Sequence, residues 1–140
     1  MTINFDQINV GDELPSLEIK FTREHLVAYA NASGDQNPIH QDEAVAKSVG
    51  LPDVIAHGML TMGRAIRVVT NWVSDPTKVF DYSVRMTRPV VVPDNGVGAT
   101  VLFTGKVGEV NTENRTVRID LSAVCDGTTV LGQAKATLQF

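Results

Sequence analysis

The sequence predicts an α+β fold in which an antiparallel sheet wraps around one central, mostly apolar helix. Two observations predict it: apolar residues recur at helical spacing over 57–73, and apolar and polar residues alternate strictly from about residue 78 onwards. The chain has 140 residues, of which 43% are apolar, so it is long enough for one domain with a small core. We therefore expect residues 1–140 to form a single domain.

A first helix is predicted between Thr22 and Gly34. Thr22 is a suitable N-cap, Phe21 can pack as a hydrophobic staple on Leu26, and Gly34 is a typical C-terminal stop. We expect His25, in the first turn, to be a solvated surface group. After the next loop, the segment QDEAVAKSVG predicts a short second helix that ends at its glycine.

The segment 57–73 predicts a longer helix of about 17 residues. Apolar side chains cover most of its circumference, which is typical of a helix enclosed by other structure. Its polar stripe is narrow and consists of Arg64, Arg67 and Asn71. This helix is therefore the candidate for the centre of the fold.

Four antiparallel strands are predicted in the C-terminal half, whereas the N-terminal half is predicted to be helical and irregular. KVFDYSVRMT and RTVRIDLSAVC alternate in the way half-buried strands do. The turn sequences PDNG, NTENR and DG divide the region into a four-stranded meander that runs to Phe140. Cys125 takes an apolar position in one strand, so we expect it to pack in the core.

A sheet curled around a central helix is the hot-dog fold. Such a sheet leaves edge strands that need cover, so a dimer that joins two sheets would complete it. The formal charge of −4 and the lack of a basic block argue against nucleic-acid binding. No apolar span or signal-peptide pattern is present, so we expect a soluble, cytoplasmic protein with no membrane contact. A single cysteine excludes a disulfide framework and a cysteine metal cage.

The loop SGDQNPIHQD, residues 33–42, has two interpretations. In the first it is an ordinary turn, in which Asp35 and Asn37 bond nearby amides, Pro38 stiffens the chain and His40 is incidental. In the second it is a reaction centre, because His40 can exchange a proton near neutral pH and Asp35 can orient water or protonate a departing hydroxyl.

The segment VIAHGMLTMG, residues 54–63, favours the second interpretation. Gly58 opens the predicted central helix, where the first amides are unpaired donors at the positive end of the helix dipole. The Gly58 amide could stabilise an oxygen that gains negative charge during a reaction. Together with Asp35 and His40, it suits the addition or removal of water across a double bond conjugated to a thioester, a reaction that requires no cofactor.

Two segments carry a resemblance to a known family. YANASGDQNPIHQDEAVA, residues 29–46, resembles the hydratase 2 motif of the MaoC-like, (R)-specific enoyl-thioester hydratases and dehydratases, and AHGMLTMG is similar to the start of that family's central helix. More narrowly, nearly the whole chain resembles the HadB-type B subunit of the mycobacterial-type (3R)-hydroxyacyl-ACP dehydratases. The resemblance implies that Asp35 and His40 are the catalytic dyad, that Gly58 supplies the catalytic oxyanion-hole amide, and that Asn37 is a loop residue that supports the active site. We also expect Asn37, Ala56 and His57 to bind substrate.

The resemblance implies reversible dehydration of (3R)-hydroxyacyl thioesters of coenzyme A or acyl carrier protein, without a metal ion or organic cofactor. It also implies a homodimer, or a heterodimer with a related hot-dog subunit. A non-catalytic acyl-binding partner subunit and a hot-dog thioesterase are the alternatives, since the fold alone does not define the chemistry.

Several roles stay open at this point. Either His40 removes the α proton while Asp35 protonates the leaving hydroxyl, or both hold a single water that supplies the proton and the hydroxide. His57 is either a second acid or base or a structural loop histidine. Arg64 and Arg67 either form an exposed stripe at an open end of the sheet, or contact a dimer partner or the phosphate of the acyl carrier.

Overall fold

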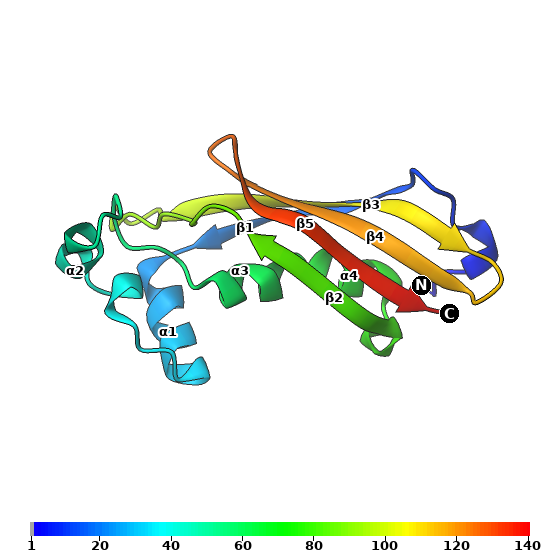
Figure 1. The fold of residues 1–140 in the computed structure, drawn as a ribbon, viewed down its shortest axis with the longest axis horizontal. Helices are drawn as coiled ribbons and strands as arrows, with labels where there is room; N and C mark the ends of the chain where they lie inside the picture. The colour runs from blue at the N-terminus through cyan, green and yellow to red at the C-terminus, as the bar shows by residue number, and fades with distance from the viewer. Residues whose placement is uncertain (1) are drawn as a thin grey trace.

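The fold, described over residues 2–140 of a computed structural model, is a five-stranded antiparallel sheet with helices against one face (Figure 1). The strand order is β1-β3-β4-β5-β2. The strands are β1 (Glu13–Phe21), β2 (Val79–Met86), β3 (Ala99–Asn111), β4 (Thr116–Cys125) and β5 (Thr128–Gln139). The helices are α1 (Arg23–Ser33), α2 (Glu43–Ser48), α3 (Gly58–Ala65) and α4 (Arg67–Val73), with short 3-10 turns η1 (Phe5–Gln7), η2 (Pro38–His40) and η3 (Pro76–Lys78).

The core lies between the sheet and helices α3 and α4. Alternate residues of β3, β4 and β5 point inward and are buried, as the period-two pattern predicts. Val68 and Val69 of α4 are buried on the same side. Gly105 lets α4 approach β3 closely, because a Cβ atom at this position would lie 3.0 Å from Cγ1 of Val68. The predicted hot-dog fold, a sheet against a central helical segment, is confirmed.

Helix α1 begins and ends where the sequence predicts. The Thr22 side chain accepts from the His25 amide at 3.3 Å, and Gly34 ends the helix at a φ of 82°. His25 is exposed, as expected, but its Nδ1 also accepts from the Thr22 amide at 3.2 Å, which completes a capping box. Because Glu or Gln is usual at this position, the capping role of a histidine was not foreseen.

The prediction of a strand-free N-terminal half is wrong. Strand β1 pairs with β3. Its register shifts between Leu14 and Leu17, a stretch that contains Pro15. The bulge interrupts the alternation that would otherwise identify the strand, since Leu17, Ile19 and Phe21 do alternate with charged residues.

The predicted four-stranded meander is also wrong in one connection. Strands β3, β4 and β5 are consecutive neighbours, but β2 pairs with β5 at the opposite edge from β1. The chain after β2 contains Pro89 and Pro93 and crosses the molecule before β3 begins. No tight turn joins β2 to β3, so the two strands are not obliged to pair.

The central helix is divided, contrary to the single helix predicted over 57–73. Helices α3 and α4 meet at Ile66, whose carbonyl accepts from the amides of Val69 and Thr70. The Met62 carbonyl accepts from the Ile66 amide at 3.3 Å and from the Tyr82 hydroxyl at 2.7 Å. A side chain that shares a helix carbonyl in this way disturbs the regular ladder.

Two further expectations concern exposure. Cys125 is buried, as predicted. Met59 is 61% exposed, so the first turn of α3 is less enclosed than its composition indicates. Within residues 2–140, helices long and apolar enough to cross a membrane are absent.

Candidate active site

A cavity of about 370 Å³ opens beside the first turn of α3. The loop before α3 and the helix itself form one wall, and the end of β2 with the residues that follow it forms the other; β5 closes the cavity. The residues around it are His40, Ile55, Ala56, Gly58, Thr61, Met86, Thr87, Arg88, Pro89, Val90, Val130 and Leu131. Most of these side chains are apolar, so the space suits an acyl chain with one polar end.

The loop between α1 and α2 is held by local side-chain bonds. The Asn37 amide donates to Oδ1 of Asp35 at 3.2 Å, and the Asn37 side chain accepts from the Ile39 amide at 3.2 Å. Asn37 thereby caps η2, with Pro38 at its start. The turn interpretation of this loop is therefore right as far as it goes, and the same turn brings His40 to the cavity wall.

His40 is buried and has a defined tautomer. Its Nδ1 lies 2.7 Å from the carbonyl oxygen of Ile55. A carbonyl can only accept, so Nδ1 carries the proton and Nε2 has a free lone pair. The Ile55 backbone is itself fixed, since its amide donates to Ile39 and the residue forms a β-bridge with Val91. Burial lowers the pKa of His40 below its ordinary value, which favours the neutral base at pH 7.

Asp35, His40 and His57 form one cluster. One side-chain donor atom from each lies within 4.8 Å of those of the other two. Asp35 is exposed and lies outside the cavity lining, whereas His40 and His57 are 7% and 2% exposed. The structure therefore brings the predicted Asp35 and His40 together, with the acidic member on the solvent side.

His57 lies behind this pair rather than in the cavity. Its ring stacks on that of His40, with centroids 3.8 Å apart, and the edge of the stack is closed by Tyr29 at 4.7 Å. Its Nε2 is 3.1 Å from the backbone oxygen of Asp35, and its Nδ1 is buried without a partner. Ala56, in contrast, lines the cavity.

The geometry of the two histidines does not suit a metal ion. A zinc site would need ring nitrogens that converge on one point at about 2.0–2.1 Å. The two rings stack with centroids 3.8 Å apart and planes inclined by 25°, so their in-plane lone pairs lie in two separate, nearly parallel planes instead of converging on one ion. One nitrogen of each ring also lies within bonding distance of a backbone carbonyl. The cluster is better arranged for proton transfer.

Gly58 is the first residue of α3, so its amide has no acceptor within the helix. Met86 of β2 lies directly over this position. A Cβ atom on Gly58 would be 3.2 Å from its Sδ and 3.3 Å from its Cε. Glycine thus keeps the backbone donor accessible beneath a flexible side chain.

The two arginines of the central helical segment lie in different environments. Arg64 is partly buried, donates to the Lys20 carbonyl at 2.8 Å and lies over the ring of Phe21. It therefore contacts β1 rather than forming an exposed stripe. Arg67 is exposed. The arginine at the cavity is Arg88, which the sequence analysis did not single out.

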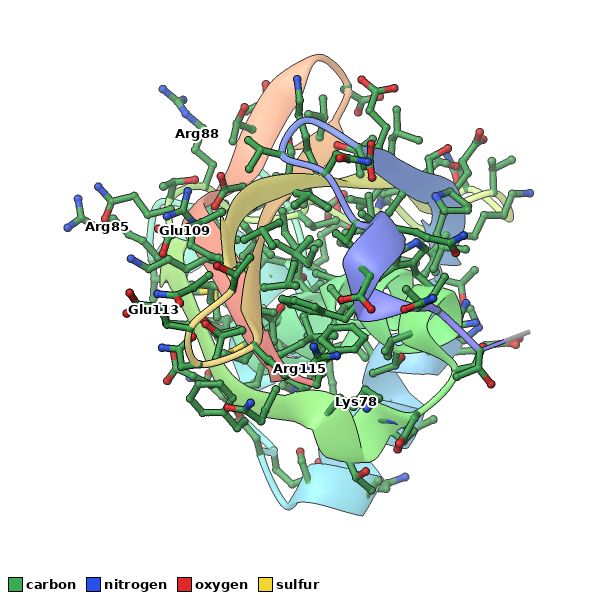
Figure 2. The ribbon with its side chains drawn as sticks, turned by 90° about the vertical axis from the view of Figure 1, so that its right-hand side faces the viewer. Lys78, Arg85, Arg88, Glu109, Glu113 and Arg115 are labelled. Atoms are coloured by element: carbon green, nitrogen blue, oxygen red, sulfur yellow. The ribbon has the colours of Figure 1, made fainter. Side chains whose placement is uncertain are left out.

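Figure 2 shows Arg88 projecting away from the ribbon on the same side of the molecule as Arg85. Arg88, Met86 and Ile55 are contributions to the site that sequence reasoning missed. Arg88 and Met86 follow or end a predicted strand, and only the pairing of β2 with β5 places them opposite Gly58. Ile55 contributes its backbone carbonyl, and a backbone contribution cannot be recognised from the residue type.

Comparison with known proteins identifies the family. Residues 7–124 match the MaoC like domain. The chain is 37% identical over 79 residues to 3-hydroxyacyl-thioester dehydratase X of Mycobacterium tuberculosis, covering 56% of this chain and 27% of that protein. It is 37% identical over 87 residues to the peroxisomal enoyl-CoA hydratase 2 of Arabidopsis thaliana, covering 56% and 28%.

This chain therefore spans little more than a quarter of the length of either curated relative. A solved structure described as a MaoC-like dehydratase superposes with a TM-score of 0.95 and 42% identity, over 99% of this chain and 42% of that one. The family match covers most of the sequence and includes the loop and helix that build the cluster. The chain belongs to the MaoC-like domain family.

Proposed function

We propose that the protein catalyses the reversible dehydration of (3R)-hydroxyacyl thioesters to trans-2-enoyl thioesters. The observation that carries this proposal is the free Nε2 of His40 at one cavity with the Gly58 amide, in a cluster where one side-chain donor atom of His40 and one of Asp35 lie within 4.8 Å of each other. The family and the names of its relatives support the same reaction class.

In the dehydration direction, His40 Nε2 takes the α proton, and the negative charge that develops on the thioester oxygen is stabilised by the Gly58 amide. The bond between the β carbon and the hydroxyl then breaks. Asp35 holds the departing hydroxyl, which takes the proton from the His40 imidazolium and leaves as water, so that His40 returns to its neutral form. The electron pair of the former C–H bond becomes the new double bond. In hydration the same atoms move in reverse.

The carrier of the acyl chain is the finer part of the proposal. Coenzyme A and the arm of an acyl carrier protein both bear phosphate, which an arginine can bind. Arg88 lines the cavity and is exposed, so it is placed to contact a carrier whose thioester lies at Gly58. We infer that Arg88 takes this role rather than Arg64 or Arg67.

The direct test is hydration of crotonyl-CoA and of a longer trans-2-enoyl-CoA by the purified protein. Loss of the conjugated-enoyl absorbance with formation of the (3R)-alcohol is the expected result. Release of free coenzyme A without a hydroxyacyl product would identify a thioesterase instead. A folded protein with neither activity on coenzyme A or carrier-protein substrates would support the alternative of a non-catalytic acyl-binding subunit.

We further propose that a second copy of the chain pairs with β2. Both edge strands carry exposed charges, but β2 also exposes Phe80 (62%) and Met86 (47%), whereas the opposite edge, β1, is interrupted at Pro15. Proline blocks edge pairing, and an apolar edge invites it. Sedimentation should give twice the 15.1 kDa chain mass, and Phe80→Asp should give a folded monomer. A monomeric wild-type protein would contradict the proposal and direct attention to a related hot-dog partner.

A further inference from the structure

The buried His57 takes no part in the proposed reaction, yet it contacts both residues of the catalytic dyad, Asp35 and His40. From this geometry we infer that His57 is a positioning residue, which fixes the positions of Asp35 and His40 relative to each other. The inference rests on the proposed dehydratase function, because it assigns His57 a role in that same site. Three observations support it: a hydrogen bond, a ring stack and an unpartnered nitrogen.

The hydrogen bond ties the loop of Asp35 to the start of α3. His57 Nε2 lies 3.1 Å from the Asp35 carbonyl, and since a carbonyl only accepts, Nε2 carries the proton. The remaining hydrogen bonds of Asp35 within residues 2–140 are to Ser33 and Asn37, which are two positions away. His57 therefore holds the Asp35 end of this exposed loop against the helix whose first amide is Gly58, while Ile55 holds the His40 end.

The stack fixes the ring plane of His40. One nitrogen of His40 donates to Ile55, but a single hydrogen bond leaves the ring free to rotate about it. The face of His57, 3.8 Å away and backed by Tyr29, limits that rotation.

The unpartnered nitrogen argues against a role in packing alone. His57 Nδ1 is buried and has no hydrogen-bond partner within the described chain. A buried polar atom without a partner destabilises the fold, so an apolar ring would pack better here. Violations of such local rules are expected at functional positions, where another requirement outweighs stability.

Two variants separate the contacts. His57→Phe keeps an aromatic face against His40 and removes the donor to Asp35, whereas His57→Gln keeps an amide donor and removes the ring. We expect each variant to lose about tenfold or more in kcat for enoyl-CoA hydration, with KM changed less than about twofold, because small misplacements of reacting groups are costly. His57→Phe should also unfold at an equal or higher temperature, since it removes the unpartnered nitrogen.

The unfolding temperature and the pH profile make these variants decisive. Wild-type kcat in both folded variants would overturn the positioning role. Loss of one limb of the pH–rate profile in both variants would also overturn it, because His57 would then exchange protons itself. If His57→Phe unfolded at a lower temperature with unchanged kcat, the role of His57 would be packing alone, which would contradict the inference.

A readout independent of activity separates this inference from the proposed function. Nitrogen-15 NMR of the wild-type imidazoles at pH 7.5 should show the proton of His57 on Nε2 and that of His40 on Nδ1. In His57→Gln, the proton of His40 should stay on Nδ1, because the Ile55 carbonyl fixes it, but the His40 ring signals should broaden as the ring loses the face that limits its rotation. A proton on His57 Nδ1 would overturn the inference whatever the activity. A protein with the expected tautomers that hydrates no thioester would instead refute the proposed reaction.

Discussion

The two walls of the cavity differ in how they are held. The wall formed by the loop and α3 presents His40 and Gly58, and its polar groups are fixed by backbone carbonyls and a buried ring stack. The other wall presents Met86, the last residue of the edge strand β2, and Arg88, which follows the strand; both are exposed. The first wall has the rigidity that proton transfer requires, and the second has the accessibility that a substrate or a partner requires.

This difference indicates a division of labour. Changes in the rigid wall should alter the rate at saturating substrate, whereas changes in the exposed wall should alter substrate binding and its salt dependence. The four predictions below test this division, from the largest expected effect to the smallest.

Loss of either member of the dyad should have the largest effect. Asp35→Asn and His40→Ala should each lower kcat about a hundredfold or more, because general acid–base groups contribute about that much. Asp94→Asn and His25→Ala are matched controls at exposed positions away from the cavity, and both should keep the rate. Near-normal turnover in either folded dyad variant would show that the rigid wall is not the reaction centre.

The pH dependence should reveal the neutral base. Because burial lowers the pKa of His40, its neutral form predominates at pH 7 and is lost only as the pH falls through that lowered value. The kcat/KM for dehydration should therefore be independent of this group near neutrality and fall about tenfold per pH unit on the acid side. The ordinary pKa of histidine is about 6.5. An acid limb with an apparent pKa above that value would contradict the assignment.

Substitution of Gly58 tests the contact between the walls. Gly58→Ala places a methyl group 3.2 Å from Met86 Sδ, so we expect kcat/KM to fall about tenfold, a cost of about 1.4 kcal/mol. Gly63→Ala is the matched control in the same helix, because a Cβ atom there meets nothing within 4 Å. Met86→Ala in the Gly58→Ala background should recover most of the loss, and additive effects would show that the two residues do not interact.

Arg88→Gln should have the smallest effect and leave kcat unchanged. We expect KM for an enoyl-CoA to rise several-fold at low salt, and the difference from wild type to shrink as salt increases, because an exposed charge is screened. Arg67→Gln, at an exposed arginine of the central helix, is the control and should leave KM unchanged. An equal rise in both variants would indicate a general charge effect rather than a carrier contact.

Local patterns in the sequence were sufficient for part of this structure. Thr22 and Gly34 bound α1 because caps depend on residue type and on immediate neighbours. The same holds for the loop of Asp35, Asn37 and His40, whose geometry arises from bonds between residues two or three positions apart. The alternation of β3 to β5 predicts the buried face of the sheet for the same reason.

Other features depended on contacts between distant segments. A bulge hid strand β1 from the sequence pattern. The break at Ile66 lies beside the hydroxyl of Tyr82 in β2, which donates to the Met62 carbonyl of α3. The pairing of β2 with β5, which carries Met86 to Gly58, leaves no mark on either strand alone.

The sequence by itself determined the caps of α1, the local turn around Asn37 and the buried faces of β3 to β5, because these follow from residue type at short spacing. Only the tertiary structure decided the tautomer of His40, the burial of His57 against it and the composition of the second cavity wall. A hydrogen bond to the Ile55 carbonyl and a stack between residues 17 positions apart depend on backbone placement, and backbone placement is set by the packing of the whole chain.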